Sequence, residues 1–137
     1  MRLDKKNPIR VARISCIGEI HDHDLFSADE HDSYNWSDSV ILEQGGFSRE
    51  WVQSKTVDGE VTLKIKLLLL STQAGMIYVS GKMELREGGV YETLDASTAV
   101  GLTPIEPGQV VEFLNTRLKN DGGDWVSTKL EIKNDSP

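Results

Sequence analysis

Alternation of apolar and polar residues is the clearest pattern in this chain. Between residues 61 and 69, every second position is apolar: Val61, Leu63, Ile65, Leu67 and Leu69. A period of two is typical of a β-strand with one buried face, because successive side chains of a strand point to opposite sides. Similar alternation predicts strands over 77–86, 110–118 and 126–133, and the β-branched stretch 9–20 predicts a further one. No stretch has helical spacing, so the pattern predicts an all-β protein.

Turn residues divide these strands. Asp58-Gly59 stands before the strand at 61–69 and fits a tight hairpin turn with positive φ angles. The polar segment 21–38 and the segment 95–108, with its Pro and Gly residues, are predicted to be long connections. Such connections are typical of Greek keys. We therefore predict one antiparallel β-sandwich domain over residues 1–137, Greek-key-like and of C2-like or immunoglobulin-like architecture, with a frayed tail at 134–137.

The number of strands depends on Gly45-Gly46. A bulge at this position gives seven strands, whereas a two-residue turn gives eight. With eight strands, the loops that follow the first, third, fifth and seventh strands share one end of the sandwich. That end then gathers Asp22, Asp24, Asp58, Glu87, Asp121 and Asp124. C2 domains have this arrangement of acidic loops, which is a likeness of architecture alone.

Charge is unevenly distributed along the chain. The net charge is -7, from 22 acidic and 15 basic residues. Eight acidic residues and no Lys or Arg lie between residues 19 and 43, whereas residues 2–13 hold five basic residues and one acidic residue. An acidic protein lacks the cations that replace counterions on phosphate, so we expect no nucleic acid as a partner.

Few features of the sequence point to export or to a membrane. The single cysteine, Cys16, cannot form an internal disulfide, and the N-terminal segment lacks the apolar stretch of a secretory signal. No apolar run is long enough for a transmembrane segment. We therefore expect a soluble, cytoplasmic protein.

All three histidines lie within residues 21–31, interleaved with carboxylates. On a strand, His21 and His23 point to the same side, and His31 adds a third imidazole, which is a ligand set that suits Zn²⁺. The carboxylates alone suit Ca²⁺, which prefers oxygen ligands. The candidate metal ligands are His21, Asp22, His23, Asp24, Asp29, Glu30, His31 and Asp32. The alternative is a solvated loop without a metal, and the core of a chain this long requires no cofactor for stability.

Two aromatic residues, Tyr34 and Trp36, lie in the same polar segment and are candidates for contact with a partner. The first functional hypothesis is a non-enzymatic interaction module that presents the loop 21–38 to a protein partner or a neighbouring domain. The basic segment 2–13 also allows a homo-oligomer. The second hypothesis is a divalent-cation-binding module, with Ca²⁺ favoured over Zn²⁺, in which the ion bridges to an anionic surface or a carbohydrate.

Catalytic motifs are not evident. The sequence has no nucleophile elbow, phosphate-binding glycine loop or paired-cysteine zinc motif. Cys16 lies in an apolar stretch, where burial makes a thiol unreactive. We expect no enzymatic activity.

Overall fold

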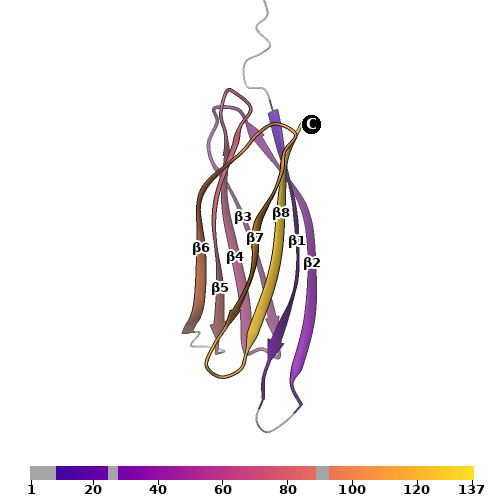
Figure 1. Ribbon diagram of the computed structural model, residues 1–137, viewed down its shortest axis with the longest axis vertical. Helices are drawn as coiled ribbons and strands as arrows, with labels where there is room; N and C mark the ends of the chain where they lie inside the picture. The colour runs from indigo at the N-terminus through magenta and orange to yellow at the C-terminus, as the bar shows by residue number, and fades with distance from the viewer. Residues whose placement is uncertain (1–8, 25–27, 89–92) are drawn as a thin grey trace, which may run out of the picture.

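Eight antiparallel strands form two packed sheets in the computed structural model, which describes residues 9–24, 28–88 and 93–137 (Figure 1). The strands are β1 (Ile9–Asp22), β2 (Glu30–Glu43), β3 (Arg49–Val57), β4 (Val61–Ser71), β5 (Ile77–Glu87), β6 (Thr93–Ile105), β7 (Val110–Lys119) and β8 (Trp125–Asp135). One sheet has the order β2-β1-β8-β7 and the other has the order β3-β4-β5-β6. The predicted all-β sandwich is confirmed, with eight strands. Within the described ranges, no helix is long and apolar enough to cross a membrane.

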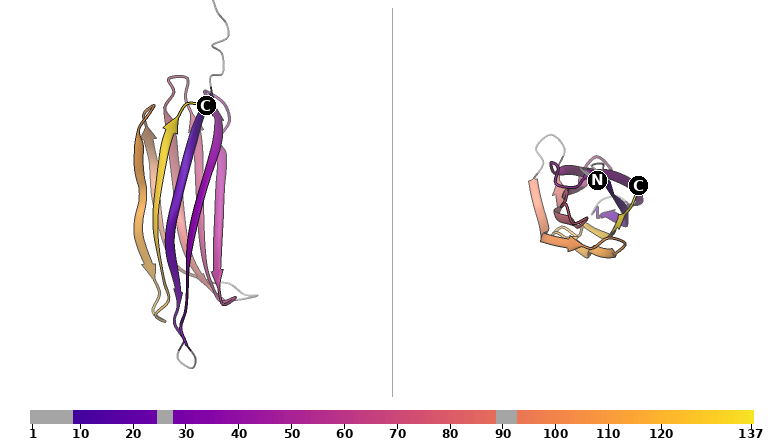
Figure 2. Two further views of the ribbon diagram at one scale, coloured as in Figure 1. Left: turned by 90° about the vertical axis from the view of Figure 1, so that its right-hand side faces the viewer. Right: turned by 90° about the horizontal axis from the view of Figure 1, so that it is seen from above.

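The connections differ from the predicted Greek key. Neighbouring strands are consecutive in the chain except for the pair β1 and β8, and the chain changes sheets between β2 and β3 and between β6 and β7. It therefore passes once around the sandwich, as the end-on view in Figure 2 shows. The predicted connections 21–38 and 95–108 lie largely in β2 and β6. Both strands border the sheets and bury few side chains, so their sequences lack the alternation that marks a strand.

The turns agree in part with their sequence signals. Asp58 and Gly59 both have positive φ angles, 55° and 66°, as expected for the hairpin between β3 and β4. The chain also reverses at Gly45-Gly46, where Gly45 has a φ of 77°. That reversal joins strands of different sheets, so it is not the two-residue hairpin that the sequence suggested.

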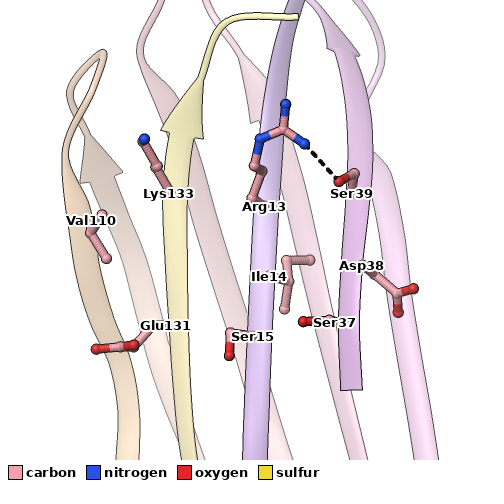
Figure 3. A pocket seen from close by; sticks show the side chains of 9 residues that line it. All are labelled: Arg13, Ile14, Ser15, Ser37, Asp38, Ser39, Val110, Glu131 and Lys133. Carbon is pink, nitrogen blue, oxygen red and sulfur yellow. Dashed lines mark hydrogen bonds between the residues drawn. The ribbon is translucent and has the colours of Figure 1, made fainter. Parts of the chain in front are cut away.

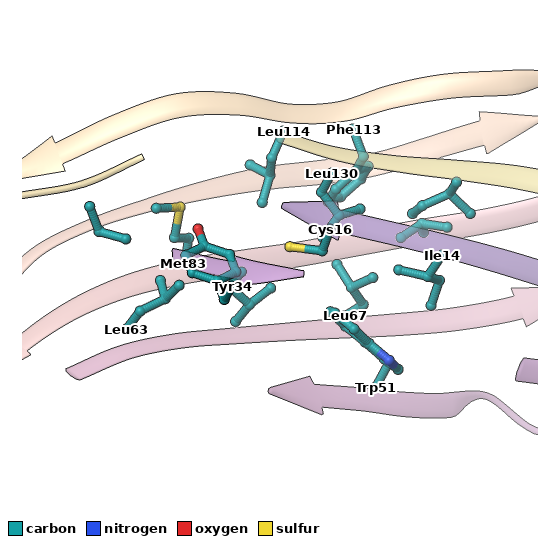
Figure 4. Packing of buried hydrophobic residues seen from close by; sticks show 14 of the residues in the cluster. Ile14, Cys16, Tyr34, Trp51, Leu63, Leu67, Met83, Phe113, Leu114 and Leu130 are labelled. Carbon is teal, nitrogen blue, oxygen red and sulfur yellow. The ribbon is translucent and has the colours of Figure 1, made fainter. Parts of the chain in front are cut away.

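Side chains from both sheets fill the space between them (Figure 4). Every second residue of β4 from Val61 to Leu69 is fully buried, which confirms the pattern that predicted this strand. Cys16 on β1 is also fully buried, and its burial raises the pKa of the thiol to about 12. The thiol is therefore protonated and unreactive at neutral pH.

A glycine on β1 makes room for a tyrosine on β2. Gly18 lies opposite Tyr34, and a Cβ atom at Gly18 would lie 1.9 Å from the Ser127 carbonyl oxygen and 2.3 Å from the Tyr34 hydroxyl oxygen. The Tyr34 hydroxyl donates to the Ser127 carbonyl at 2.6 Å and also contacts the Thr128 hydroxyl. Tyr34 thus reaches across β1 to β8 inside the core, which only a glycine on β1 permits.

The C-terminal residues are ordered in β8 as far as Asp135, so the prediction of a frayed tail from residue 134 is wrong. Asn134 is fully buried, and its amide donates to the carbonyl oxygens of Gly75 at 2.7 Å and Ile105 at 2.8 Å. Its Oδ1 accepts from Arg10 Nε at 2.8 Å. The polar sequence 134–136 does not indicate that Asn134 is buried, because a buried asparagine with all its hydrogen bonds made cannot be distinguished from an exposed one by sequence.

Candidate metal centre

The ends of β1, β3, β5 and β7 and the starts of the strands that follow them lie at the lower end of the molecule in Figure 1, together with the turns at 58–60 and 120–124. We call this end, with the strand residues that border it, the acidic end. The eight-stranded alternative predicted this grouping. Six of its carboxylates belong to Asp22, Asp58, Glu60, Glu87, Asp95 and Asp124. Among the described residues, none of these six carboxylates forms an ion pair with Lys or Arg.

Asp22, the last residue of β1, points into the sandwich. Alternation along β1 places Asp22 on the same side as the buried Ile20, and only 3% of its surface is exposed. Its Oδ2 atom is buried and has no hydrogen-bond partner in the part of the chain that the structure describes. The carboxylates of Asp58 and Glu60 face it from the turn between β3 and β4, and one oxygen from each of the three residues lies within 4.8 Å of the others. A buried, unpartnered carboxylate oxygen is costly unless a cation or a proton joins it.

The pKa of Asp22 is raised to about 6, mainly by burial and then by the neighbouring Asp124 carboxylate, Glu60 and Asp58. The carboxyl group therefore holds a proton more tightly than an ordinary aspartate does. The same surroundings favour any other cation at this position, because a divalent ion would remove the repulsion among the carboxylates.

Asn120 holds three further carboxylates together. Its Nδ2 lies 2.9 Å from Glu87 Oε2, 3.0 Å from Asp95 Oδ2 and 2.9 Å from Asp124 Oδ2. An amide nitrogen has two hydrogens, so it cannot fully satisfy three acceptors. The pKa of Glu87 rises to about 7, mainly through its hydrogen bond with Asp124 and then through burial. A shallow hollow of about 310 Å³ opens beside this group.

The histidines form a separate group on the outer side of β1. Asp29 Oδ2 lies 3.1 Å from His21 Nε2 and 3.2 Å from His23 Nδ1, and these three residues can offer ligand atoms to one ion. His31 lies beside His21, with their Nδ1 atoms 3.3 Å apart. The predicted ligand set is therefore divided between two faces of β1, with Asp22 inside and the imidazoles outside.

The remaining predicted ligands belong to neither group. Asp32 pairs with Lys55 Nζ at 2.9 Å, across the gap between β2 and β3. Asp24 takes part through its backbone N–H, which donates to Asp29 Oδ1 at 3.0 Å. Glu30, opposite Asp22 on β2, is exposed and joins no group of candidate ligands.

Tyr34 and Trp36 do not form the exposed aromatic pair that the sequence suggested. Tyr34 is 7% exposed and hydrogen-bonded inside the core. Trp36 is half-buried, stacks on Tyr34 with 4.6 Å between ring centroids, and meets Trp51 edge-on at 6.4 Å. The polar neighbours of these rings are the exposed face of an edge strand rather than a loop. Contact with a partner through Trp36 or Tyr34 stays a prediction, and burial leaves only a small part of Tyr34 available for it.

Sequence reasoning missed several contributors to the acidic end. Glu60 lies just after the Asp58-Gly59 turn, and only the hairpin geometry brings both acids to one place. Asn120 had no signal beyond its place in a turn. Asp95 lay in the segment predicted as a connection.

Another hollow, of about 450 Å³, lies on the outer face of the β2-β1-β8-β7 sheet (Figure 3). Three of its charged groups, Arg13, Asp38 and Lys133, have partners. Arg13 Nε donates to Asp135 Oδ2 at 2.7 Å, and its Nη1 donates to Ser39 Oγ at 3.1 Å. Asp38 accepts from Trp51 Nε1 at 2.8 Å. Most of the charge that lines this hollow is therefore already paired, in contrast to the acidic end.

The chain matches no protein-family model, and no curated protein is detectably similar to it in sequence. The arrangement of side chains at the acidic end is therefore the basis for a functional assignment.

Proposed function

We propose that this protein is a divalent-cation-binding β-sandwich module that holds Ca²⁺ between Asp22, Asp58 and Glu60. The observation that carries the proposal is the buried Asp22 carboxylate. Its Oδ2 atom has no hydrogen-bond partner among the described residues, and one of its oxygens lies within 4.8 Å of an oxygen of Asp58 and of Glu60. A divalent cation satisfies this atom and cancels the repulsion that raises the pKa of Asp22.

Calcium is the cation that these ligands favour. All three are carboxylates, and hard cations prefer oxygen ligands. Two oxygens bound to one Ca²⁺ at about 2.4 Å are at most about 4.8 Å apart, and the three carboxylate oxygens meet this limit. Asp58 and Glu60 are exposed, so they can adjust to the irregular coordination that Ca²⁺ accepts.

The exposure of Asp58 and Glu60 also bears on the role of the ion. Three protein ligands leave several of the six to eight coordination positions of Ca²⁺ to solvent. An ion at this end of the sandwich would therefore offer positions to an oxygen of a second molecule. In this proposal, the ion bridges the module to an anionic surface or a carbohydrate.

Thermal melting with EDTA, Ca²⁺ or Mg²⁺ tests the proposal. A free ion at 100 times its dissociation constant stabilises the folded state by about 2.7 kcal/mol. For 137 residues, the entropy of unfolding is about 0.3 kcal/mol per degree, so the melting temperature should rise by about 9 °C with Ca²⁺. The Asp58→Asn variant should lose this rise.

Asp121→Asn is the matched control, because Asp121 is exposed at the same end and lies outside the three-carboxylate group. It removes the same charge and should keep the calcium response. Equal responses of the two variants would mean that Ca²⁺ acts through the general negative charge. An unchanged melting temperature in saturating Ca²⁺ would rule out the site.

A further inference from the structure

The imidazole group on the outer face of β1 is built around a fixed ring. His21 lies between His31 on β2 and Trp125 on β8 in the strand register. Its ring stacks on Trp125 with 5.3 Å between centroids and 9° between planes, and the Arg117 guanidinium lies 4.0 Å from the centroid of the same indole. The stacking holds the plane of the His21 ring before any ligand arrives.

Three donor atoms converge beside this ring. Asp29 Oδ2 is 3.1 Å from His21 Nε2 and 3.2 Å from His23 Nδ1, and Asp29 Oδ1 accepts from the Asp24 backbone N–H at 3.0 Å. In a tetrahedral Zn²⁺ site with bonds of about 2.0 to 2.1 Å, neighbouring ligand atoms lie about 3.3 to 3.4 Å apart. The two distances differ from this value by a few tenths of an ångström, and the ligand atoms of all three residues lie within 4.8 Å of one another.

A count of protons gives an independent reason for a cation here. Glu19, His31, His21 and Asp29 form a chain with three contacts: 3.2 Å from Glu19 Oε1 to His31 Nε2, 3.3 Å between the Nδ1 atoms, and 3.1 Å from His21 Nε2 to Asp29 Oδ2. Each contact needs one proton between its two atoms. Two neutral imidazoles carry two protons, and both ends of the chain are carboxylates. One of the three contacts therefore requires an added cation.

We propose that the contact between His21 Nε2 and Asp29 is the position of a Zn²⁺-type transition metal, with His23 Nδ1 as the third ligand. The two imidazole protons then complete the other two hydrogen bonds of the chain. His21 Nδ1–H donates to His31 Nδ1, and His31 Nε2–H donates to Glu19, which is the outer support common for metal-binding histidines. His23 and Asp29 are exposed, so the fourth position faces solvent. This site differs from the proposed calcium site in its ligands, its preferred metal and its face of β1.

Titration of the full chain with Zn²⁺ in excess Ca²⁺ tests this inference. Calorimetry at pH near 7.5 should show one site, and Co²⁺ in place of Zn²⁺ should give the visible absorption of a four-coordinate ion. His31→Ala removes only the outer support and should weaken Zn²⁺ binding about 10- to 100-fold. His23→Ala and Asp29→Asn each remove a ligand and should weaken it by more than that.

Asp58→Asn is the control, because it changes the carboxylate site alone and should leave Zn²⁺ affinity unchanged. The Asp29→Asn variant keeps the shape of the side chain, so it gives a result even if His23→Ala does not fold. Zinc binding that survives both ligand variants would overturn the proposal. So would the absence of zinc binding together with an imidazolium nitrogen signal for His21 or His31 in NMR spectra, which would show that a proton fills the position.

Discussion

The Asp22→Asn variant separates two effects of the buried carboxylate: its effect on the stability of the folded protein and its proposed role in binding Ca²⁺. The substitution keeps the shape of the side chain, removes its charge and adds an N–H group that can donate to the neighbouring carboxylates. The rise in the pKa of Asp22 from 3.8 to about 6 corresponds to as much as ~3 kcal/mol at pH 7, because each tenfold change in proton affinity is worth about 1.4 kcal/mol. The folded protein without metal should therefore gain up to ~3 kcal/mol.

The sign of this effect follows from linkage. The folded-state pKa lies above the unfolded value, so the carboxylate destabilises the folded state at pH above about 6, and protonation relieves the cost as the pH falls. Asparagine has no such cost at any pH. In EDTA at pH 7, Asp22→Asn should raise the melting temperature by about 10 °C, using about 0.3 kcal/mol per degree for 137 residues.

Differential scanning calorimetry of both proteins, in EDTA and in Ca²⁺, measures the two effects together. The variant should be the more stable in EDTA and should lose the calcium response, which is the trade-off expected where a strained site serves binding. A variant that is less stable than the parent in EDTA would refute the reasoning, because it would show that the carboxylate is a satisfied structural acceptor. A variant that keeps the full calcium response would show that Asp22 is not a ligand.

Three further predictions concern the core and the pH dependence. Gly18→Ala should abolish or severely destabilise folding, because its Cβ would lie 1.9 Å from the Ser127 carbonyl oxygen; a circular dichroism melt within 2 °C of the parent, about 0.6 kcal/mol, would contradict this. Tyr34→Phe should cost about 1 to 3 kcal/mol in urea unfolding, because buried acceptors lose their donor, and a neutral effect would show that water replaces the hydroxyl. In EDTA, the melting temperature should rise as the pH falls from about 8 to 5, since the raised pKa values of Asp22 and Glu87 let the folded state bind protons first; a fall over this range would disprove their dominance.

The sequence predicts strands well where one face is buried and the other is wet. β4 alternates from Val61 to Leu67 and β8 from Val126 to Lys133, and the ends that the pattern predicts for both strands lie within two residues of the observed ends. The sequence predicts connections in place of β2 and β6, because these strands bury few side chains and their polar residues resemble those of loops. Strand order also escaped prediction, since it depends on pairing between β1 and β8 at opposite ends of the chain.

The sequence predicts where the candidate site lies better than it predicts which residues form it. The local excess of acidic residues identified the end of the sandwich, and the eight-stranded count brought Asp58 and Asp124 to it. The division of His21 and Asp22 between two faces follows from strand alternation, once β1 is known to continue to Asp22. The burial of Asp22 and the approach of Glu60 depend on packing between the sheets, which local sequence does not encode.

An even number of antiparallel strands has a practical consequence for binding measurements. β1 begins and β8 ends at the same end of the molecule, opposite the acidic end (Figure 1). A tag or a surface linker attached at the C-terminus is therefore remote from the candidate metal ligands. Immobilised protein presents these ligands to the solution, so vesicles, glycans or candidate proteins can be passed over it with and without calcium.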